Sequence, residues 1–385
     1  MEKFKEEKRM KKLFALLLAL AMVFALAACG SNGGNNAPAA SGDKSAAPAA
    51  SAGSGDKAEA TGDVDPLTIK FSSTYQETET GGTIEQYFID QLKEISGGAI
   101  DVDITWGGTL FDASGELDAV MDGVVDMIAL GHMPHLDTLP YLSMPGFAPG
   151  GTQAALDYFN TLMFDDPDTS ALIQSEAEDM GIKYLNVIAG GANALAAKFP
   201  FTDLQSLVAG SSSFGNFDAA IFEKLGFQVT AVTPPECYEA LDRGMIDATQ
   251  MGLAPMVSMA WYEVAPYWAL DGTYTAGNFF TVNLDWWESL TDAQRDCIQK
   301  AADATEEYSA TLYDDAIASD LATIEEKTGN KIVELSDADI DTFWAACFDA
   351  KAADALTRAE KHGVTDGMRT ILEKAAEITN YDWQG

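Results

Sequence analysis

Positive charge is scarce in this sequence. Only 23 of its 385 residues are lysine or arginine, against 60 aspartates and glutamates, which gives a formal net charge of −37 at pH 7. Six of the basic residues lie in the first 28 positions, and the rest of the chain carries 17 basic and 57 acidic residues, a net charge of −40. A chain of this charge repels nucleic acid and anionic lipid surfaces, so we expect neither as a partner.

Cysteines and the signatures of common enzymes are also sparse. Three cysteines follow Cys29, an odd number without the spacing of a metal site: Cys237, Cys297 and Cys347. This pattern does not indicate a structural disulfide. The sequence has no P-loop, dinucleotide fingerprint or H-E-x-x-H motif, and Gly210–Gly215 does not match the G-x-S-x-G nucleophile elbow. We therefore expect no cofactor, no metal and no enzymatic activity.

The N-terminus has the pattern of a secretory signal. Residues 1–28 begin with basic residues and continue as an uncharged apolar run from Leu13 to Ala28, which is too short to span a membrane. The run ends in Leu-Ala-Ala-Cys-Gly and resembles the bacterial lipobox, whose cysteine, here Cys29, is lipid-modified and becomes the first residue of the mature chain. The alternative is an ordinary signal peptide with an incidental cysteine, and Met10 is an alternative start.

Residues 29–65 predict a flexible tether. This stretch consists mainly of Gly, Ser, Ala and Asn and has too little apolar surface to offset the entropy lost on ordering. We expect the protein at the extracytoplasmic face of the cell membrane, attached through its lipid anchor.

Two segments 121 residues apart share one pattern, LDAVMDGVVDM at 117–127 and YEALDRGMIDA at 238–248. The identical positions are an alanine, a glycine and an aspartate: Ala119/Ala240, Gly123/Gly244 and Asp126/Asp247. Each copy predicts an amphipathic helix closed by a glycine and followed by a buried strand. Two copies suggest two lobes of similar construction that face each other across a cleft, rather than one continuous sheet. The alternative is a chance match between two common helix–strand units.

The order of elements predicts a mostly parallel sheet flanked by helices. In the first half, strands are expected at 67–73, 100–106 and 124–130, with helices at 83–95 and 114–122. In the second half, strands are expected at 184–189, 207–209 and 227–232, with a helix at 216–225. Thr291 and Gln294 form a capping box that opens a long helix reaching to about residue 326. A strand at 331–335 and helices from 336 and 367 complete the prediction.

Candidate ligand contacts follow the strands, because ligands of such sheets bind beyond the carboxyl ends of the strands. In the first lobe these candidates are Thr74, Tyr75 and His132. A metal site at His132, His135 and Asp137 would need further ligands at defined spacing, so we interpret these as loop residues.

In the second lobe, Ser211 and Ser212 can hold a carboxylate through hydroxyl and backbone N–H groups, and Phe214 follows them. The alternative is a solvated loop. Gln250 and Met251 end the strand of the second copy.

Aromatic residues gather between positions 261 and 280. Most are expected in the core. Tyr274 and Trp268 are the two that we expect to reach a ligand.

The whole pattern resembles the substrate-binding proteins of tripartite ATP-independent periplasmic (TRAP) transporters, the dicarboxylate-binding-protein family. The resemblance covers about residues 66–378 and rests on four ordered passages: Glu116–Met127, Leu139–Phe147, Glu236–Asp247 and Trp286–Gln294. It implies an α/β, two-lobe periplasmic-binding-protein-like fold with crossing strands and a long bracing helix. It also implies a monomer that hands an organic acid to TRAP membrane permease subunits.

One family feature is missing. The family usually has an arginine in a D-L-K-G-x-K-I-R passage, where it pairs with a ligand carboxylate, and residues 203–213 contain none. Lys198 lies near a second basic position of the family and is our candidate cation, with a surface lysine as the alternative. If neither Lys198 nor the serines hold an anion, the ligand is neutral or carries an amine.

The expected domains are a signal peptide at 1–28, the tether at 29–65, a first lobe with the bracing helix at 66–195 plus 281–325, and a second lobe at 196–280 plus 326–385. The function expected is capture of a small polar molecule by hinge closure. A lipid-anchored ligand sensor for a signalling partner and an extracellular hydrolase are the alternatives.

Overall fold

A mixed β-sheet runs through the part of the chain that the structure, a computed structural model, describes: residues 64–131, 135–216 and 218–385. Its strands are β1 (Leu67–Ser72), β2 (Ile100–Thr105), β3 (Met127–Gly131), β4 (Phe147–Pro149), β5 (Ile182–Ala197), β6 (Phe214–Gly215), β7 (Val229–Thr230), β8 (Ala248–Gly252) and β9 (Tyr267–Asn283). The predicted signal peptide, nearly all of the tether, Cys29 and His132 lie outside the described residues.

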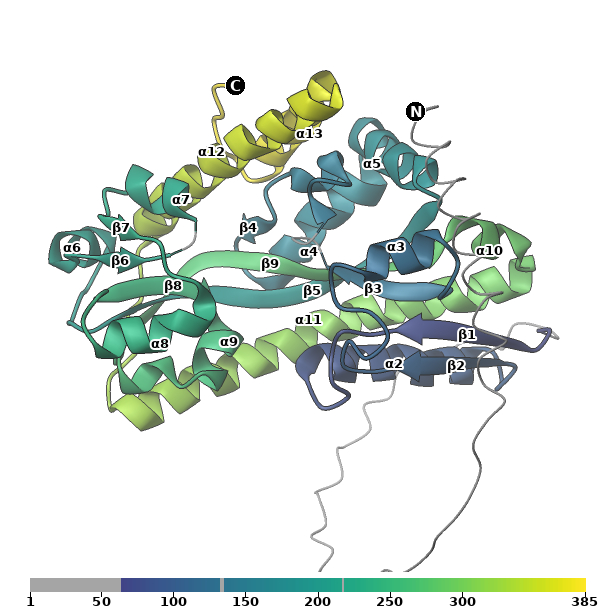
Figure 1. Cartoon of the computed structure of the whole chain (residues 1–385), viewed down its shortest axis with the longest axis horizontal. Coiled ribbons are helices and arrows are strands. Elements are labelled where there is room, and N and C mark those ends of the chain that lie inside the picture. The colour runs from purple at the N-terminus through teal and green to yellow at the C-terminus, as the bar shows by residue number, and fades with distance from the viewer. Residues whose placement is uncertain (1–63, 132–134, 217) are drawn as a thin grey trace, which may run out of the picture. The chain divides into compact units, whose positions relative to one another are not determined.

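The strand order is β2-β1-β3-β9-β5-β8-β6-β7, with β4 beside β9. Strands β1, β2 and β3 pair in parallel at one end, and β6, β7 and β8 pair in parallel at the other. We call these groups, with the helices packed on them, lobe I and lobe II. Between them the long strands β5 and β9 pair antiparallel and pass from one lobe to the other (Figure 1).

The expectation of two separate sheets is wrong. Strand β9 pairs with β3 of lobe I, and β5 pairs with β8 of lobe II, so the hydrogen-bonded ladder is continuous. The cause is the length of the crossing strands, 16 and 17 residues, where the sequence predicted only a six-residue strand at 184–189. The predicted α/β fold with two lobes is confirmed.

Twelve α-helices surround this sheet within the described residues. They are α2 (Thr80–Ile95), α3 (Glu116–Met121), α4 (Thr152–Asn160), α5 (Pro167–Asp179), α6 (Leu204–Gly210), α7 (Ala219–Lys224), α8 (Pro234–Asp242), α9 (Leu253–Ser258), α10 (Leu284–Ser289), α11 (Asp292–Thr328), α12 (Asp337–His362) and α13 (Thr365–Ile378). Short 3-10 helices occupy Pro140–Ser143 and Trp261–Glu263, and a π-helical turn occupies Thr161–Asp165.

The predicted bracing helix is confirmed as α11. It begins at the predicted capping box of Thr291 and Gln294 and ends at Gly329, whose φ of 71° closes the helix. With 37 residues at about 1.5 Å each, it is about 55 Å long. Helix α11 packs against α2 of lobe I and α9 of lobe II, and Figure 1 shows it running from one lobe to the other past both helices.

Several predicted elements differ in extent or type from the structure, and three of the differences are instructive. Helix α2 begins at Thr80 rather than Thr83, and its N-cap is Glu79. The strand expected at 207–209 belongs to helix α6, because Asp203 caps that helix by accepting a hydrogen bond from the Ser206 N–H. The strand expected at 331–335 is reduced to one bridge between Val333 and Ala269.

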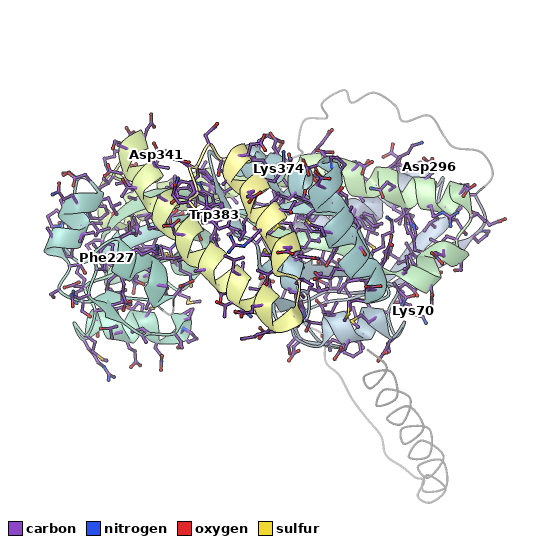
Figure 2. All side chains as sticks on the ribbon, turned by 90° about the horizontal axis from the view of Figure 1, so that it is seen from above. Lys70, Phe227, Asp296, Asp341, Lys374 and Trp383 are labelled. Atoms are coloured by element: carbon purple, nitrogen blue, oxygen red, sulfur yellow. The ribbon has the colours of Figure 1, made fainter. Side chains whose placement is uncertain are left out.

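Helices α12 and α13 lie across the centre of the described unit. Figure 2 shows both from above, with Phe227 of lobe II toward one end and Lys70 of β1 toward the other. Helix α12 starts after Ser336, as the sequence predicted, and Ser336 forms a capping box with Asp339.

The buried core contains Trp268 and the three cysteines that follow Cys29. Trp268 is 1% exposed and donates to the Ala265 carbonyl at 2.6 Å, so the expectation that it reaches a ligand is wrong. The three cysteines within the described residues are buried and free. No helix among the described residues has both the length and the apolar composition to cross a bilayer.

Candidate functional site

The two repeat copies form the same local structure. Gly123 and Gly244 both have φ of +68°, and each closes a helix, as the sequence predicted. In lobe I, the Asp126 N–H donates to the Lys70 carbonyl at 2.9 Å, and the Asp126 carboxylate accepts from the Lys70 N–H at 2.8 Å. This aspartate therefore locks the start of β3 to the neighbouring strand β1.

Asp247, the matching aspartate of lobe II, is the anion that the serine loop holds. Its carboxylate accepts from the Ser211 hydroxyl at 2.8 Å, from the Ser212 N–H and hydroxyl at 2.9 and 2.5 Å, and from the Ser213 N–H at 3.3 Å. Burial acts to raise the pKa of Asp247, but these hydrogen bonds outweigh it and lower the pKa. The serines do bind a carboxylate, but it is one of the protein's own, so Ser211 and Ser212 are already engaged.

Lys198 of lobe II occupies the same structural position as Asn283 of lobe I. Its ammonium donates to the Leu241 carbonyl at the end of α8, and its N–H donates to the Asp247 carbonyl. Asn283 occupies the same place in lobe I, because its side chain donates to the Val120 carbonyl at 2.8 Å and its N–H to the Asp126 carbonyl. Lys198 therefore closes a helix in lobe II, as Asn283 does in lobe I.

Phe214 lies in the core rather than in a cleft. It has no exposed surface, and its ring centroid is 4.5 Å from that of Phe222 and 4.3 Å from that of Phe227. The expectation that Phe214 contacts a ligand is therefore wrong.

A cavity of about 50 Å³ with several polar side chains in its wall lies where β5, β8 and β9 meet α7 and α12. Its polar lining consists mainly of amides and one ion pair: Asn193, Asn216, Gln250, Thr273, Asp218 and Lys351. Phe147, Asp218 and Lys351 also line a second cavity of about 390 Å³, which extends to Ser143 and Arg358. The two cavities therefore adjoin and bring residues that follow β3 next to residues of lobe II.

The floor of this site is a hydrogen-bonded network on the crossing strands. Gln250 Nε2 donates to Asp271 at 2.7 Å, and the N–H and hydroxyl of Thr273 donate to the same carboxylate at 2.8 and 2.7 Å. Asp271 has no exposed surface, and burial raises its pKa to about 6. Asn193 donates to the Thr273 hydroxyl at 3.0 Å. Gln250 is thus held at the site by its neighbours.

The cations of the site come from α12, and the sequence pattern did not reveal them. Lys351 pairs with Asp218, has a side chain only 17% exposed, and lies 5.6 Å from the centre of the Phe147 ring. Arg358 pairs with Asp137 and Asp354 at the edge of the larger cavity. The candidate cations of the sequence lay within residues 66–283, and nothing in the sequence of α12 indicates that this helix crosses the site.

The remaining predicted contacts have mixed positions. Thr74 and Tyr75 follow β1 and are half-buried. Met251 pairs with Ala194 on β5 and packs against the hydrophobic cluster beneath α9. Tyr274 lies on β9 between β4 and β5 and is half-buried.

A cavity of about 340 Å³ lies beside α11. Thr80 of lobe I, the α9 segment that follows β8, and Gly191 of β5 line it, together with Tyr313 of α11. Both lobes therefore contribute to this cavity as well, and α11 forms one of its walls.

These features define a class. Two α/β lobes joined by crossing strands, with cavities between them that hold a few polar groups, are the architecture of an extracytoplasmic solute-binding protein. The profile of the family described as bacterial extracellular solute-binding protein, family 7 (DctP), matches residues 71–350. This chain belongs to that family, and its resemblance to TRAP substrate-binding proteins is confirmed.

Several known proteins are similar to this chain. The C4-dicarboxylate-binding periplasmic protein DctP of Rhodobacter capsulatus is 23% identical over 256 residues, which are 63% of this chain and 73% of that protein. A TRAP periplasmic solute-binding protein from Ochrobactrum anthropi matches with a TM-score of 0.67 and 23% identity, over 81% of this chain and 97% of its own. Another, from Rhodoferax ferrireducens with bound malonate, matches with a TM-score of 0.63 and 18% identity, over 81% of this chain and 98% of its own.

Proposed function

We propose that this protein is the lipid-anchored solute receptor of a TRAP-type transporter. It captures a small polar molecule, an organic acid, by closure of its two lobes and delivers this molecule to the membrane permease. The observation that carries the proposal is the amide-lined cavity beside Lys351. Family membership and the malonate bound by a structural relative support the acid class.

Lys351 supplies the charge that the missing family arginine would supply. A carboxylate of the ligand can take the place of Asp218 on the ammonium, while Asn193, Asn216 and Gln250 donate amide hydrogens. The Phe147 ring beside the ammonium excludes water from one side. The protein acts by binding, and no step of catalysis is assigned to it.

Lobe closure is supported by the irregular middle of the crossing strands. The β5–β9 pairing shifts register four times between Tyr184 and Ala194. Bulges interrupt the ladder and allow local bending. We place the lobe boundaries within these two strands, with residues 66–195 and 281–325 in the first lobe and 196–280 and 326–385 in the second.

The test compares two lysine–aspartate pairs. Malonate and succinate are titrated into the wild-type protein, Lys351→Met and the control Lys224→Met, whose lysine pairs with Asp349 on the surface. The wild type should bind, and ligand at about a hundred times Kd should stabilise it by about 2.7 kcal/mol. Loss of the buried charge should weaken binding about 10- to 100-fold, since a hydrogen bond to a charged group contributes about 1.5–3 kcal/mol.

Lys224→Met should bind like the wild type, because Lys224 lines neither of the two cavities. Equal affinity of Lys351→Met and the wild type for these acids would remove Lys351 from the site. No binding of any small polar compound would contradict the function itself.

A further inference from the structure

A buried carboxyl group in lobe I has no partner. Glu85 lies on α2 and is 2% exposed, yet neither of its carboxyl oxygens has a hydrogen-bond partner among the described residues. The nearby Ser73 hydroxyl donates instead to the Tyr75 carbonyl at 3.5 Å and accepts from the Tyr75 N–H at 3.1 Å. A buried polar group without a partner is costly, so a group that satisfies Glu85 would stabilise this region.

Glu85 lines a cavity with room for one small group. Its volume is about 10 Å³, roughly that of a single water molecule. Polar groups reach it from three other elements: Tyr75 after β1, Asn278 on β9 and Tyr313 on α11. The Asn278 side chain is within hydrogen-bonding reach of the Tyr75 hydroxyl. The cavity therefore offers oxygen acceptors and aromatic rings around one position.

Two glycines keep the walls of this cavity close together. A Cβ atom on Gly81 would lie 2.4 Å from the Tyr75 ring, and one on Gly277 would lie 2.3 Å from the Ala189 carbonyl oxygen. The Tyr75 ring can lie against the start of α2 only because Gly81 has no side chain. Gly81, to which the sequence pattern assigned no role, thus shapes one wall of the cavity.

The chemistry of the lining favours a cation with several N–H donors. The lining offers carboxyl, hydroxyl and amide oxygens as acceptors and contains no lysine or arginine. Two tyrosine rings add the faces that attract an ammonium group. No group of three or more potential metal ligands occurs among the described residues, which argues against a metal ion here.

We propose that this cavity, formed by Glu85, Tyr75, Asn278 and Tyr313, binds a protonated primary amine, and that the solute of this protein carries such an amine in addition to its acid group. This inference rests on the proposed function and specifies its substrate class: an amino acid or related zwitterion. Tyr313 lines both this cavity and the cavity of about 340 Å³ beside α11, and Thr80 of the larger cavity precedes Gly81 of the smaller one. The amine would enter from the side of the larger cavity.

Binding of an amine should release a proton. Burial raises the pKa of Glu85 to about 8, with the Glu116 carboxyl adding to the shift and Ser73 opposing it. The other titratable groups that face Glu85 are Tyr75 and Tyr313, whose pKa values burial also raises. Glu85 is thus mostly protonated at pH 7, and pairing with an ammonium group requires it to ionise. Affinity for an amine should rise about tenfold per pH unit from pH 6 to 8 and then level off.

The test uses compounds that differ only by the amine. Glutamate is compared with glutarate, and 4-aminobutyrate with butyrate, by calorimetry on the wild type, Glu85→Gln and Glu116→Gln. Glu116 is a matched control: it is equally buried, burial also raises its pKa to about 8, but it accepts from the Ser72 hydroxyl at 3.3 Å and does not line the cavity. In the wild type and in Glu116→Gln, the compound that carries the amine should bind at least tenfold more tightly than the compound of the same pair that lacks it. In Glu85→Gln this ratio should fall to about one, and the pH dependence should disappear.

Proton release provides a second measurement on the wild type alone, should Glu85→Gln fail to fold. Binding of an amine at pH 7 in phosphate and in Tris should show release of nearly one proton, whereas glutarate should show none. If acids bind equally with and without an amine, or if a water molecule alone satisfies Glu85 and no proton is released, the inference is overturned and the proposed function stands. If neither class binds, the proposed function fails, and this inference fails with it.

Discussion

Lobes I and II share the same arrangement of helix, glycine, strand and aspartate, but the carboxyl groups that they enclose differ in charge. In both, a helix closes on a glycine, a strand follows, and an aspartate locks that strand to its parallel neighbour. Lobe I buries Glu85 and Glu116, whose pKa values burial raises to about 8, so these groups are uncharged at neutral pH. Lobe II holds Asp247 as a charged group among three serines.

This difference shows that the repeated sequence pattern determines the backbone structure but does not determine which charged or uncharged side chains surround it. The backbone hydrogen bonds of Asp126 and Asp247 are the same, since each donates to a carbonyl of the parallel strand and each carbonyl accepts from a crossing strand. The side chains around them differ, and they decide where a ligand group can be held. In lobe I, the Glu85 carboxyl has no hydrogen-bond partner among the described residues, whereas in lobe II the Asp247 carboxylate accepts hydrogen bonds from the serine loop.

The largest expected difference between the lobes is their response to pH. The carboxyls of Glu85, Glu116 and Glu176 each have a pKa raised to about 8 by burial, against 4.5 for an exposed glutamate. A raised folded-state pKa in an acid means that its contribution to stability is full below about pH 4.5 and is lost as pH rises toward 8. Ionisation of each of these carboxyl groups should lower the free energy of unfolding by on the order of 1 kcal/mol per pH unit between about pH 4.5 and 8.

Asp247 has the opposite sign, because its lowered pKa stabilises lobe II above about pH 4 and this contribution is lost only in stronger acid. Hydrogen exchange, corrected for intrinsic rates, should therefore show β1 and β3 better protected at pH 5.5 than at pH 8. Strands β6 and β8 should change less, because the pKa of Asp271, which Gln250 of β8 contacts, is raised only to about 6. Equal change in both lobes would contradict this assignment, and Glu116→Gln should reduce the pH response of lobe I.

The second-largest expected effect is a difference in stability between variants of the two aspartates, Asp247 and Asp126. Asp247→Ala removes the acceptor of four hydrogen bonds, and Asp126→Ala removes the acceptor of one. We expect a loss of about 3 kcal/mol in the free energy of unfolding for the first and about 1 kcal/mol for the second, from the strength of hydrogen bonds to charged groups after solvent competition. Urea unfolding measures both, and equal losses would show that the serine loop contributes nothing.

The smallest effect concerns the two helix-closing side chains. Lys198→Ala removes one donor to a helix carbonyl, that of Leu241. Asn283→Ala removes the donor to the Val120 carbonyl and also the side-chain oxygen that accepts from the Trp286 N–H at the start of α10. The free energy of unfolding should fall by about 1 kcal/mol in the first variant and about 2 kcal/mol in the second, and ligand affinity should stay unchanged in both. Loss of acid binding in Lys198→Ala alone would return Lys198 to the ligand site and end its equivalence with Asn283.

The sequence predicted much of the fold because its signals are local. The capping box at Thr291, the helix start at Ser336, and the glycines at 123 and 244 each act within one turn of chain and were confirmed. The crossing strands were underestimated because their alanines and glycines carry little strand propensity, and pairing over 16 and 17 residues depends on tertiary context.

The site was less predictable for the same reason. Gln250 was predicted as a ligand contact from its place near the end of a predicted strand, and in the structure it lines the cavity beside Lys351. The serine loop was predicted to hold a carboxylate, but the carboxylate it holds is that of Asp247, which lies more than 30 residues further along the chain. Lys351 and Glu85 lie on helices, where a charged residue usually faces solvent. Only their burial in the folded protein distinguishes them.

The long pairing of β9 with β3 has a consequence for how the chain reaches its final state. Met127 faces Val282 across the ladder, 155 positions later. Until β9 has been synthesised, one edge of β3 stays open, and open edges of this kind invite pairing with other chains. A truncated gene product that ends before β9 should therefore aggregate rather than yield an isolated half, and refolding of the intact chain should be slow.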